Sequence, residues 1–332
     1  ALYINGGGSK KNLAGRSCPA PSLEVGAHRG ILDYQSAELV LTARAGTTLR
    51  EIVEVLDAEN QVLGFDPPLL DDRATLGGTL ATNLSGPARP WRGSVRDAVL
   101  GVQLINGKAE LLNFGGKVMK NVAGYDVSRL QAGALGTLGV LTQVSLRVVP
   151  RPEHELSLAY EMAADEAIST MNQRAGEAKP LSGACWLDGR LYLRLSGAAS
   201  AVEHTARQWG GEQYTQCEVW EALREMSLPF FQGDAPLWRL SLKPTTESDI
   251  EQGSMLIDWG GAQRWLRANI DLERAHASAQ RGGGHALLFR GGDREGHLRA
   301  TPNAIERRLL QRLKRAFDPH GILNPGRLHA DL

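Results

Sequence analysis

The sequence predicts an α+β fold of two domains followed by a C-terminal helix, and three observations support this prediction. Pro150 and Pro152 break strand pairing and separate a half rich in Gly, Ala and Thr from a half of different character. After these prolines, strands and hairpins alternate with helices, as in an antiparallel sheet that carries helices on one face. An amphipathic helix then lies near the end of the sequence. The expected parts are a first domain at 1–150, a second domain at 151–300 and a tail at 301–332.

The composition excludes several classes of protein. The 332 residues carry 37 basic and 37 acidic side chains, which cancel, so no net field favours nucleic acid or an acidic membrane surface. No apolar run is long enough to cross a bilayer, and we expect no direct insertion into a membrane. The three cysteines are too far apart for a zinc or iron–sulfur site, which favours reduced thiols in a cytoplasmic protein.

The first half is predicted to contain short strands and one well-defined helix. Thr48 and Glu51 form a capping box, and the apolar residues after Thr48 recur with helical spacing on one face. Strands are expected at 38–43, 98–105 and 139–149. Only four residues stand before the asparagine that leads into the first glycine loop, which is a poor start for a sheet. We therefore expect native sequence ahead of the first residue.

The second half is predicted to repeat a pattern of strands, hairpins and helices. Its first hairpin turns at Asp188-Gly189, the dipeptide that a type I′ turn prefers, and the helix after it stops at Gly210. A second hairpin turns at Gly260-Gly261. The expected elements lie at 156–162, 164–178, 184–195, 199–211, 237–243, 254–267, 271–281 and 285–291.

A further helix is predicted at 303–317, where Asn303 and Glu306 can cap the first turn. Asp318-Pro319 ends this helix, and an extended, turn-rich segment follows. The apolar stripe of the helix consists of Ile305, Leu309, Leu310 and Leu313.

The stretch YINGGGSKK at residues 3–11 places three consecutive glycines between a short apolar run and two lysines. It does not fit a Walker A loop, and the third glycine of a Rossmann fingerprint would fall on Lys11. Bare backbone N–H groups can approach an anion closely, and Ser9 and Lys10 add a hydroxyl donor and a positive charge. These features suit a pyrophosphate. A plain glycine-rich turn is the alternative for this triplet taken alone.

Two further loops of small residues favour a ligand over a plain turn. They lie within residues 74–104 and 115–150, and their glycines can form walls without side chains against a large, flat cofactor. These glycines are Gly77, Gly78, Gly133, Gly136 and Gly139.

Together these segments resemble the FAD-linked oxidases of the vanillyl-alcohol oxidase type, which have a PCMH-type FAD-binding domain. The resemblance covers nearly the whole chain. It rests on the first loop, on TLGGTLATN with GSVRDAVLG, on KNVAGYD with GTLGVLT, and on the terminal FDPHGILNPGRL. The segments INGGGSK, GGKVMKNVAGYD and GGGHALLFRGGD are similar in particular to the FAD-binding subunits of glycolate oxidases.

The resemblance implies that FAD lies between two subdomains of the first domain and faces a ferredoxin-like antiparallel cap domain. It also implies that the C-terminal helix packs back on the first domain, since Asn324 matches a polar residue that returns to the flavin. The FAD is expected to be non-covalent, because residues 4–12 contain no histidine that could link it. The other residues that match FAD-binding positions are Gly6, Gly7, Gly8, Ser9, Lys10, Thr75, Gly77, Gly78, Thr82, Asn83, Ser85, Gly86, Gly139 and Val140.

The resemblance also bears on catalysis. Relatives that oxidise D-2-hydroxy acids carry the histidine pair HxxxxxxH and a nearby acid, which bind a divalent metal at the substrate. In this sequence His285 matches the first histidine, but Gly292 stands at the second position, so we expect no metal site. His285 and Arg290 are left as candidate catalytic residues. The simpler interpretations are an interface histidine and a solvated arginine at a strand edge.

Four polar residues lie in the most distinctive motif, GGKVMKNVAGYD: Lys117, Lys120, Tyr125 and Asp126. No titratable partner can be identified for them from the sequence. We therefore favour a supporting role over a catalytic one. The lysines would neutralise phosphate charge or lie on a solvated face, and the tyrosine and aspartate would hold the loop.

These departures from the catalytic relatives favour a flavin-carrying relay or assembly subunit of a glycolate (D-2-hydroxy acid) oxidase complex, which oxidises glycolate to glyoxylate. The expected partners are a paralogous flavin subunit with the metal-dependent centre, an iron–sulfur subunit that takes the electrons, and a small 2-hydroxy acid as substrate. One alternative is a self-sufficient FAD-dependent oxidoreductase of a small alcohol or hydroxy acid. A second is a non-catalytic scaffold, against which the intact glycine loops argue. The complex is expected in the cytoplasm, or peripherally at the inner membrane through its partners.

Overall fold

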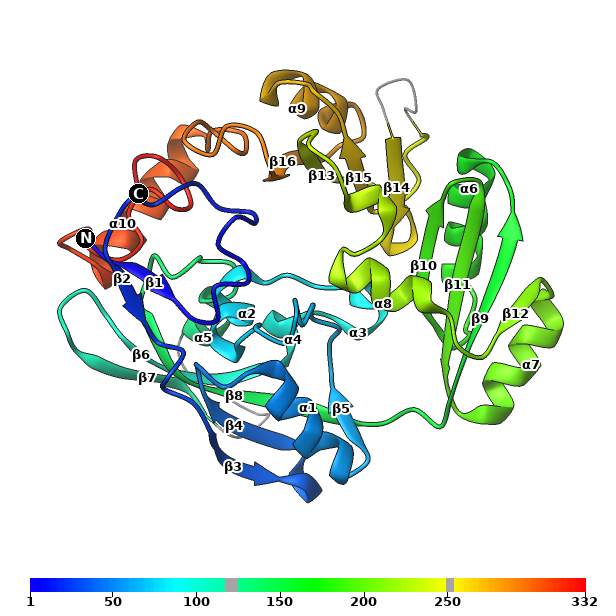
Figure 1. Cartoon of the computed structure of the whole chain (residues 1–332), viewed down its shortest axis with the longest axis horizontal. Helices are drawn as coiled ribbons and strands as arrows, with labels where there is room; N and C mark the ends of the chain where they lie inside the picture. The colour runs from blue at the N-terminus through cyan, green and yellow to red at the C-terminus, as the bar shows by residue number, and fades with distance from the viewer. Residues whose placement is uncertain (117–124, 249–253) are drawn as a thin grey trace.

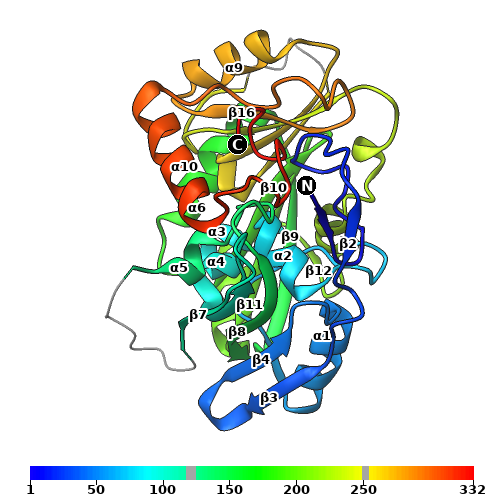
Figure 2. The same cartoon turned by 90° about the vertical axis from the view of Figure 1, so that its left-hand side faces the viewer.

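The computed structural model describes residues 1–116, 125–248 and 254–332, and these residues form two large antiparallel sheets. Figure 1 shows the first sheet in the lower part of the molecule and the second from the top to the right. The two ends of the chain lie close together beside the C-terminal helix, as both views show (Figures 1 and 2). Within the described ranges, no helix is both long and apolar enough to cross a bilayer.

The first half of the chain forms a six-stranded sheet around β8 (Val140–Pro150), which pairs with β4, β6 and β5. The order is β3-β4-β8-β6-β7, and β5 pairs with the end of β8. A separate parallel pair, β1 with β2, precedes this sheet. The remaining strands are β1 (Tyr3–Asn5), β2 (Ser22–Glu24), β3 (Ile31–Gln35), β4 (Val40–Arg44), β5 (Gln61–Leu63), β6 (Val99–Ile105) and β7 (Leu111–Gly115).

The predicted strands at 98–105 and 139–149 are confirmed to within one residue. The strand predicted at 38–43 begins later, at Val40, because a short 3₁₀-helix precedes it and Leu39 adopts a left-handed conformation with φ of 57°. Apolar periodicity does not report such a turn. Short 3₁₀-helices in the described part of the chain include Ser36–Glu38, Pro229–Phe231 and Trp259–Gly261.

Helix α1 (Leu49–Ala58) forms where the capping box predicts it. The Glu51 N–H donates to the Thr48 hydroxyl at 3.2 Å, and the Thr48 N–H donates to the Glu51 carboxylate at 2.9 Å. Its buried residues belong to one core with the sheet, and each such side chain contributes about 1.5–3 kcal/mol. The shorter helices of this half are α2 (Leu76–Thr82), α3 (Arg89–Arg92), α4 (Val95–Ala98) and α5 (Val127–Leu130).

The second half forms an eight-stranded antiparallel sheet with the order β12-β9-β11-β10-β14-β15-β13-β16. The predicted hairpin at Asp188-Gly189 is confirmed, since these residues have φ angles of 48° and 83°, as a type I′ turn requires. The second predicted hairpin, through Gly260-Gly261, joins β14 to β15. The strands are β9 (His154–Glu161), β10 (Leu181–Leu187), β11 (Arg190–Gly197), β12 (Glu212–Tyr214), β13 (Leu237–Ser241), β14 (Ser254–Asp258), β15 (Gln263–Arg267) and β16 (His285–Arg290).

Helices α6, α7 and α9 contact this sheet, and α7 ends at Gly210 as predicted. Neighbouring residues of a strand point to opposite faces, and β13 shows what lies on each. Leu240 lines one cavity with Ser278 of α9, whereas Arg239 lines another with Ser85 of the first half. Helix α9 and the first half of the chain therefore cover opposite faces of this part of the sheet. The helices are α6 (Ala164–Ala175), α7 (Ala199–Trp209), α8 (Glu218–Glu225) and α9 (Leu272–Arg281).

Helix α10 (Ala304–Phe317) has the predicted capping box at Asn303 and Glu306. Its C-terminal end returns to the first half of the chain, because the Lys314 amine donates to the Thr137 carbonyl at 2.8 Å. Its apolar stripe is only partly covered. Ile305 and Leu309 are 74% and 58% exposed, whereas Arg307 in the first turn pairs with Asp331 of the tail at 2.6 Å.

Candidate functional site

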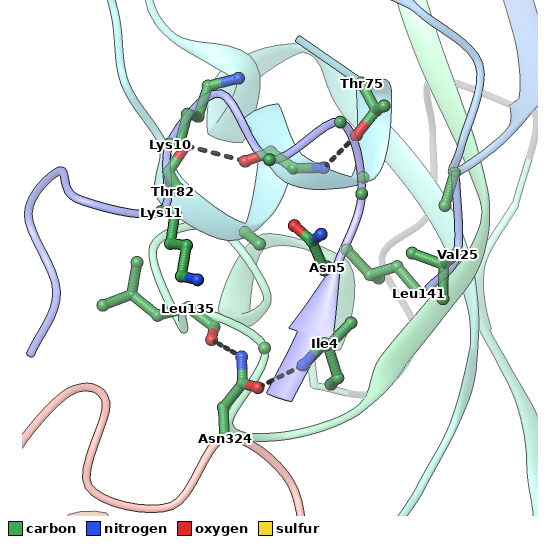
Figure 3. A pocket seen from close by; sticks show the side chains of 18 of the residues that line it. Ile4, Asn5, Lys10, Lys11, Val25, Thr75, Thr82, Leu135, Leu141 and Asn324 are labelled. Atoms are coloured by element: carbon green, nitrogen blue, oxygen red, sulfur yellow. Dashed lines mark hydrogen bonds between the residues drawn. The ribbon is translucent and has the colours of Figure 1, made fainter. Parts of the chain in front are cut away.

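Three loops and the C-terminal tail enclose a cleft of about 730 Å³ beside the six-stranded sheet, which we call the main cleft (Figure 3). Its walls come from segments far apart in the sequence: the first glycine loop, the start of α2, the turn before β8, and the tail. The predicted residues that line it are Gly6, Gly7, Gly8, Ser9, Lys10, Thr75, Gly77, Gly78, Thr82, Gly139 and Asn324. The structure therefore brings most of the predicted cofactor residues together.

The first loop follows β1 and packs tightly on the segment before α2. A Cβ atom on Gly7 would lie 1.7 Å from the Arg73 carbonyl oxygen, and one on Gly6 would lie 2.6 Å from the Thr75 hydroxyl. Gly8 has φ of 71°, a conformation that side chains rarely adopt. Close packing against the Arg73 backbone thus requires Gly7, and close packing against the Thr75 side chain requires Gly6. Because these positions have no side chains, the loop presents bare backbone to the cleft.

The second loop is held by local hydrogen bonds at the start of α2. The Gly78 N–H donates to the Thr75 hydroxyl at 3.2 Å, and the Thr82 hydroxyl donates to the Gly78 carbonyl at 2.8 Å (Figure 3). A Cβ atom on Gly77 would lie 2.8 Å from that of Ala45. The helix therefore lies directly on β4 and its following turn, and it presents backbone to the cleft.

Asn324 joins three of the walls. The Ile4 N–H donates to its Oδ1 atom at 2.7 Å, and its Nδ2 atom donates to the Leu135 carbonyl at 2.6 Å (Figure 3). Leu2 also pairs with Leu323 as an isolated parallel bridge. The side chain is 4% exposed, so these bonds are shielded from water. The predicted return of the chain end to the cleft is a direct contact between β1 and the tail.

The cations at the main cleft are Lys11 and Arg327, whereas the sequence indicates Lys10. The Lys10 amine is directed away from the cleft in Figure 3 and lies 3.4 Å from the Thr79 hydroxyl, and burial lowers its pKa to about 8. The amine of Lys11 lies on the cleft side, and Arg327 of the tail also lines the cleft. Lys10 therefore contributes backbone, whereas Lys11 and Arg327 contribute charge. Neither of these two was singled out from the sequence.

Four predicted cofactor residues do not line the main cleft: Asn83, Ser85, Gly86 and Val140. Val140 begins β8 and is buried. Ser85 and Gly86 line a second cavity of about 330 Å³ between the first half and the eight-stranded sheet, which we call the interface cavity. Its other lining residues are Pro68, Leu84, Leu223, Arg224, Met226, Arg239, Asp258, Gln263, Trp265 and Phe289.

Polar contacts fix the two halves on either side of the interface cavity. The Trp259 indole donates to the Gly86 carbonyl at 3.0 Å. Asp66 pairs with Arg194 at 3.6 Å and with Arg224 at 3.8 Å. These side chains are largely buried, so the ion pairs hold the halves in a defined register and are costly to break.

Asp258→Asn is expected to stabilise the protein progressively as the pH rises from 4 to 8. Burial raises the pKa of the Asp258 carboxyl to about 7, and Asp66 raises it further, while bonds from Trp259 and Gln263 and the charge of Arg194 lower it. A carboxyl with a raised folded pKa stabilises fully below its unfolded pKa of about 4, and this contribution is lost as the pH rises through about 7.

An asparagine side chain does not titrate and loses no stability in this range. The free energy of unfolding of Asp258→Asn, measured in urea, should therefore rise relative to that of wild type by on the order of 3 kcal/mol between these pH values. A difference in the free energy of unfolding that does not change with pH would show that the pKa of Asp258 is not raised.

The two candidate catalytic residues do not share a cavity. His285 begins β16, is exposed, and lines a groove beside α10 with Arg299 and His329. Partial burial of the imidazole ring, and then the charges of Arg239 and Arg299, lower the pKa of His285. Arg290 donates to the Phe231 carbonyl. A catalytic role for either stays a prediction.

The residues of the GGKVMKNVAGYD motif are only partly described. Lys117 and Lys120 lie outside the described residues. Tyr125 is 98% exposed. Asp126 accepts from the Arg129 N–H at 3.0 Å and caps α5, as expected of a residue that holds the loop. In the described ranges, no group of three or more His, Cys, Asp or Glu side chains could hold a metal.

Comparisons with known proteins agree with this architecture. Residues 1–115 match the family described as FAD binding domain, and residues 291–328 match the family of FAD linked oxidases, C-terminal domain. Alkyldihydroxyacetonephosphate synthase has the same fold, with a TM-score of 0.67 over 98% of this chain and 71% of that chain, at 15% identity.

Sequence relatives define the family more closely. The chain is 45% identical over 331 residues to the glycolate oxidase subunit GlcE of Escherichia coli (strain K12), which covers 100% of this chain and 93% of that protein. It is 30% identical over 154 residues to the glycolate oxidase subunit GlcD of Bacillus subtilis (strain 168), covering 46% of this chain and 33% of that protein. The resemblance inferred from the motifs is confirmed. The chain belongs to the FAD-linked oxidase family, as a homologue of the glycolate oxidase subunit GlcE.

Proposed function

We propose that this chain is the FAD-binding subunit of a complex that oxidises glycolate, a small 2-hydroxy acid, to glyoxylate. The observation that carries the proposal is the main cleft, whose glycine loops present bare backbone, with Lys11 and Arg327 beside them. Backbone N–H groups and two cations fit the pyrophosphate of a dinucleotide. When bound, FAD supplies hydride acceptance and electron transfer. The likeness to GlcE along the whole chain supports glycolate as the substrate of the complex.

In this proposal the three parts of the chain have different roles. Residues 1–150 would hold FAD, since they form the six-stranded sheet and most of the cleft. Residues 151–300 would form the cap, since they form the eight-stranded sheet. Residues 301–332 would close the cleft through Asn324, which bonds to both β1 and the turn before β8.

The FAD would be held without a covalent bond. Among the described residues that line the main cleft, none is a histidine or a cysteine that could attach the flavin. The affinity must then come from the backbone, the two cations and the apolar contacts of the cleft. Ile4 and Leu135 supply such contacts at the tail side of the cleft, and Val25 and Leu141 at the sheet side (Figure 3).

The electrons would leave through a partner. The three cysteines, Cys18, Cys185 and Cys217, are free, and Cys185 is buried, which supports an iron–sulfur cluster in another subunit. A paralogous flavin subunit with the substrate centre would complete the complex, and the likeness to GlcD supports such a paralogue. The chain would then act as a relay, in the cytoplasm or at the inner membrane through these partners.

A second candidate function is oxidation of the substrate by this chain itself. The interface cavity favours it, because it adjoins Ser85 and Gly86, which match flavin-binding positions, and contains Arg239 and Asp258. In this case the same flavin would serve as oxidant and as relay. The two candidates differ in whether isolated protein reacts with glycolate.

The visible spectrum of the protein purified alone tests both candidates. We expect flavin absorbance that acid precipitation releases into the supernatant, since the bond is non-covalent. We also expect that anaerobic glycolate or D-lactate leaves the absorbance unchanged, as a relay requires. Bleaching would instead establish a catalyst, and flavin that stays with the precipitate would establish a covalent link. Protein that lacks flavin even after co-expression with its partners would overturn the proposal.

A further inference from the structure

The first turns of α10 carry the two most exposed large aliphatic side chains of the described residues, Ile305 and Leu309. These residues are four positions apart, so they lie side by side on one face of a helix at the outside of the molecule (Figures 1 and 2). Arg308 and Arg312 are exposed and recur on this face with helical spacing. We call these four residues the α10 face. Neighbouring apolar side chains exposed to this degree are typical of an interaction surface.

A groove with about 520 Å³ of free space adjoins this face, and Leu309 belongs to both. We call it the α10 groove. It lies between the start of β16, the segment that follows Leu298, and the first turns of α10, and much of its surface is apolar. Ala286, Pro302 and Leu310 contribute to that surface. The groove is open to solvent and large enough to accept projecting side chains of another molecule.

Arg299 gives the α10 groove a cation without an anionic partner. Its guanidinium donates to the Ala14 carbonyl at 2.9 Å, whereas its Nε atom is buried and has no hydrogen-bond partner. No carboxylate of the described residues pairs with it, and burial alone lowers its pKa. Glu306, the acid of the lining, accepts instead from the Asn303 N–H at 3.0 Å and caps α10. Together with the arginines of the α10 face, the groove therefore favours carboxylates.

Two histidines, His285 and His329, complete the polar side of the groove. Partial burial of the rings, and then nearby arginines, lower the pKa of both, so at neutral pH they are uncharged and offer N–H donors. Asp331 lies in the same tail as His329, but it pairs with Arg307 at 2.6 Å. The charge of Arg299 thus stays available to an acid that enters from outside.

A polypeptide fits this surface better than a bilayer does. An amphipathic helix that binds a membrane lies flat on it, with its apolar face toward the acyl chains. Here Arg299 and the two histidines are recessed in a groove, which the plane of a bilayer cannot enter. A segment that projects from another protein can place a carboxylate on Arg299 while its apolar side chains cover Ile305 and Leu309.

The α10 groove and the main cleft share the tail of the chain. His329 lines the groove, and Asn324, five positions earlier, lines the main cleft. Five residues span at most about 18 Å. A protein seated in the groove is therefore close to the FAD that we propose for the main cleft, as an electron acceptor must be.

We propose that the α10 face and the α10 groove form the docking surface for the electron-accepting iron–sulfur subunit, which presents an apolar segment flanked by carboxylates. Leu309 would pack on the apolar part of that segment, and Arg299, Arg308 and Arg312 would bind its carboxylates. An apolar centre with a polar rim is the usual anatomy of a protein interface. The inference rests on the proposed function for the identity of the acceptor, but the surface can be tested without flavin.

Photo-cross-linking within the complex of this chain and its two partner subunits tests the surface directly. A photoreactive phenylalanine analogue replaces Ile305 in one variant and Leu111, a 56% exposed residue of β7, in a matched control. We expect a light-dependent cross-link from position 305 to the iron–sulfur subunit and none from position 111 to that subunit. A cross-link from position 305 to the paralogous flavin subunit, or no cross-link at all, would overturn the proposal.

The affinity of the purified chain for the iron–sulfur subunit gives a second test. Leu309→Asp should raise the dissociation constant at least about tenfold, because it places a charge against an apolar segment. Arg308→Glu should also weaken binding, and added salt should weaken binding by wild type. Leu111→Asp is the matched control and should change nothing, since Leu111 and Leu309 are similarly exposed. Equal affinities of wild type and Leu309→Asp would count against the surface.

Two further measurements separate this inference from a membrane site and from the FAD proposal. Sedimentation with vesicles of equal parts phosphatidylglycerol and phosphatidylcholine should leave wild type in solution. Sedimentation of wild type that Leu309→Asp abolishes would replace the protein partner by a lipid surface. Flavin content should be the same in every variant, because none of the altered residues lines the main cleft. Wild type without flavin would count against the FAD proposal, whereas the cross-link from position 305 would still report the docking surface.

Discussion

Gly7→Val is expected to abolish FAD binding and to destabilise the protein by at least about 3 kcal/mol. The Cβ atom alone would lie 1.7 Å from the Arg73 carbonyl oxygen, so either the loop or the segment before α2 must move. Both segments line the main cleft, and its walls would then separate. The measurements are flavin content and the melting temperature with and without added FAD. For wild type, FAD at 1,000 times its Kd should stabilise by about 4 kcal/mol.

Two control variants separate the clash from the loss of a ligand contact. Gly64→Ala places a Cβ at 3.5 Å from its nearest neighbour, in ordinary contact, and should change neither property. Lys11→Met removes a cation at the cleft and should weaken FAD binding without lowering the melting temperature of the apo protein. A normal FAD response in Gly7→Val would contradict the assignment of the main cleft.

Lys314→Met is expected to cost about 3–5 kcal/mol, because it leaves a buried charge without its partner. The Lys314 amine donates to Asp318 at 2.7 Å and to the Thr137 and Leu323 carbonyls at 2.8 Å each. Asp318 is 2% exposed and retains only its bonds from the backbone N–H groups of Ile322 and Leu323. Urea unfolding at pH 7 measures the loss. Arg312→Met, an exposed cation of the same helix, should change stability by less than about 0.5 kcal/mol.

The pH dependence of this loss has a definite sign. The bond from Lys314 and the backbone N–H groups of Ile322 and Leu323 hold the pKa of Asp318 below its ordinary value, although burial opposes them. A carboxylate with a depressed folded pKa stabilises above its unfolded pKa of about 4, and this contribution is lost as the pH falls through the folded pKa. The difference between wild type and Lys314→Met should therefore shrink in acid. If the difference in the free energy of unfolding stays the same at low pH, the loss comes from side-chain packing and not from the charge of Asp318.

Local signals predict the elements well because they act over a few residues. The capping boxes at Thr48 and Asn303 and the turn at Asp188-Gly189 are each contained within one turn of chain, and the structure has all three. Motif residues also predict which loops meet at the main cleft. Their spacing in the sequence does not determine side-chain direction. Lys10 and Lys11 are adjacent, yet only the second has its amine on the cleft side.

The interface cavity could not be predicted, because it depends on register and on packing between distant segments. Arg239, Gln263 and Asp258 belong to three strands, and only their pairing places them on one face. Ser85 then reaches them from the other half of the chain. The exposed stripe of α10 has a similar origin. Helical periodicity reports an apolar face, but it does not report whether another element covers Ile305 and Leu309.

The closure of the main cleft by the tail has a consequence for biosynthesis. Ile4 and Asn324 are 320 positions apart, and their hydrogen bond joins the first loop to the last wall of the cleft. During translation the glycine loop leaves the ribosome long before this wall exists. The cleft can therefore reach its final geometry only after Asn324 has been synthesised and has left the ribosome. The cofactor site that we propose is thus assembled by the first and the last parts of the chain to be made.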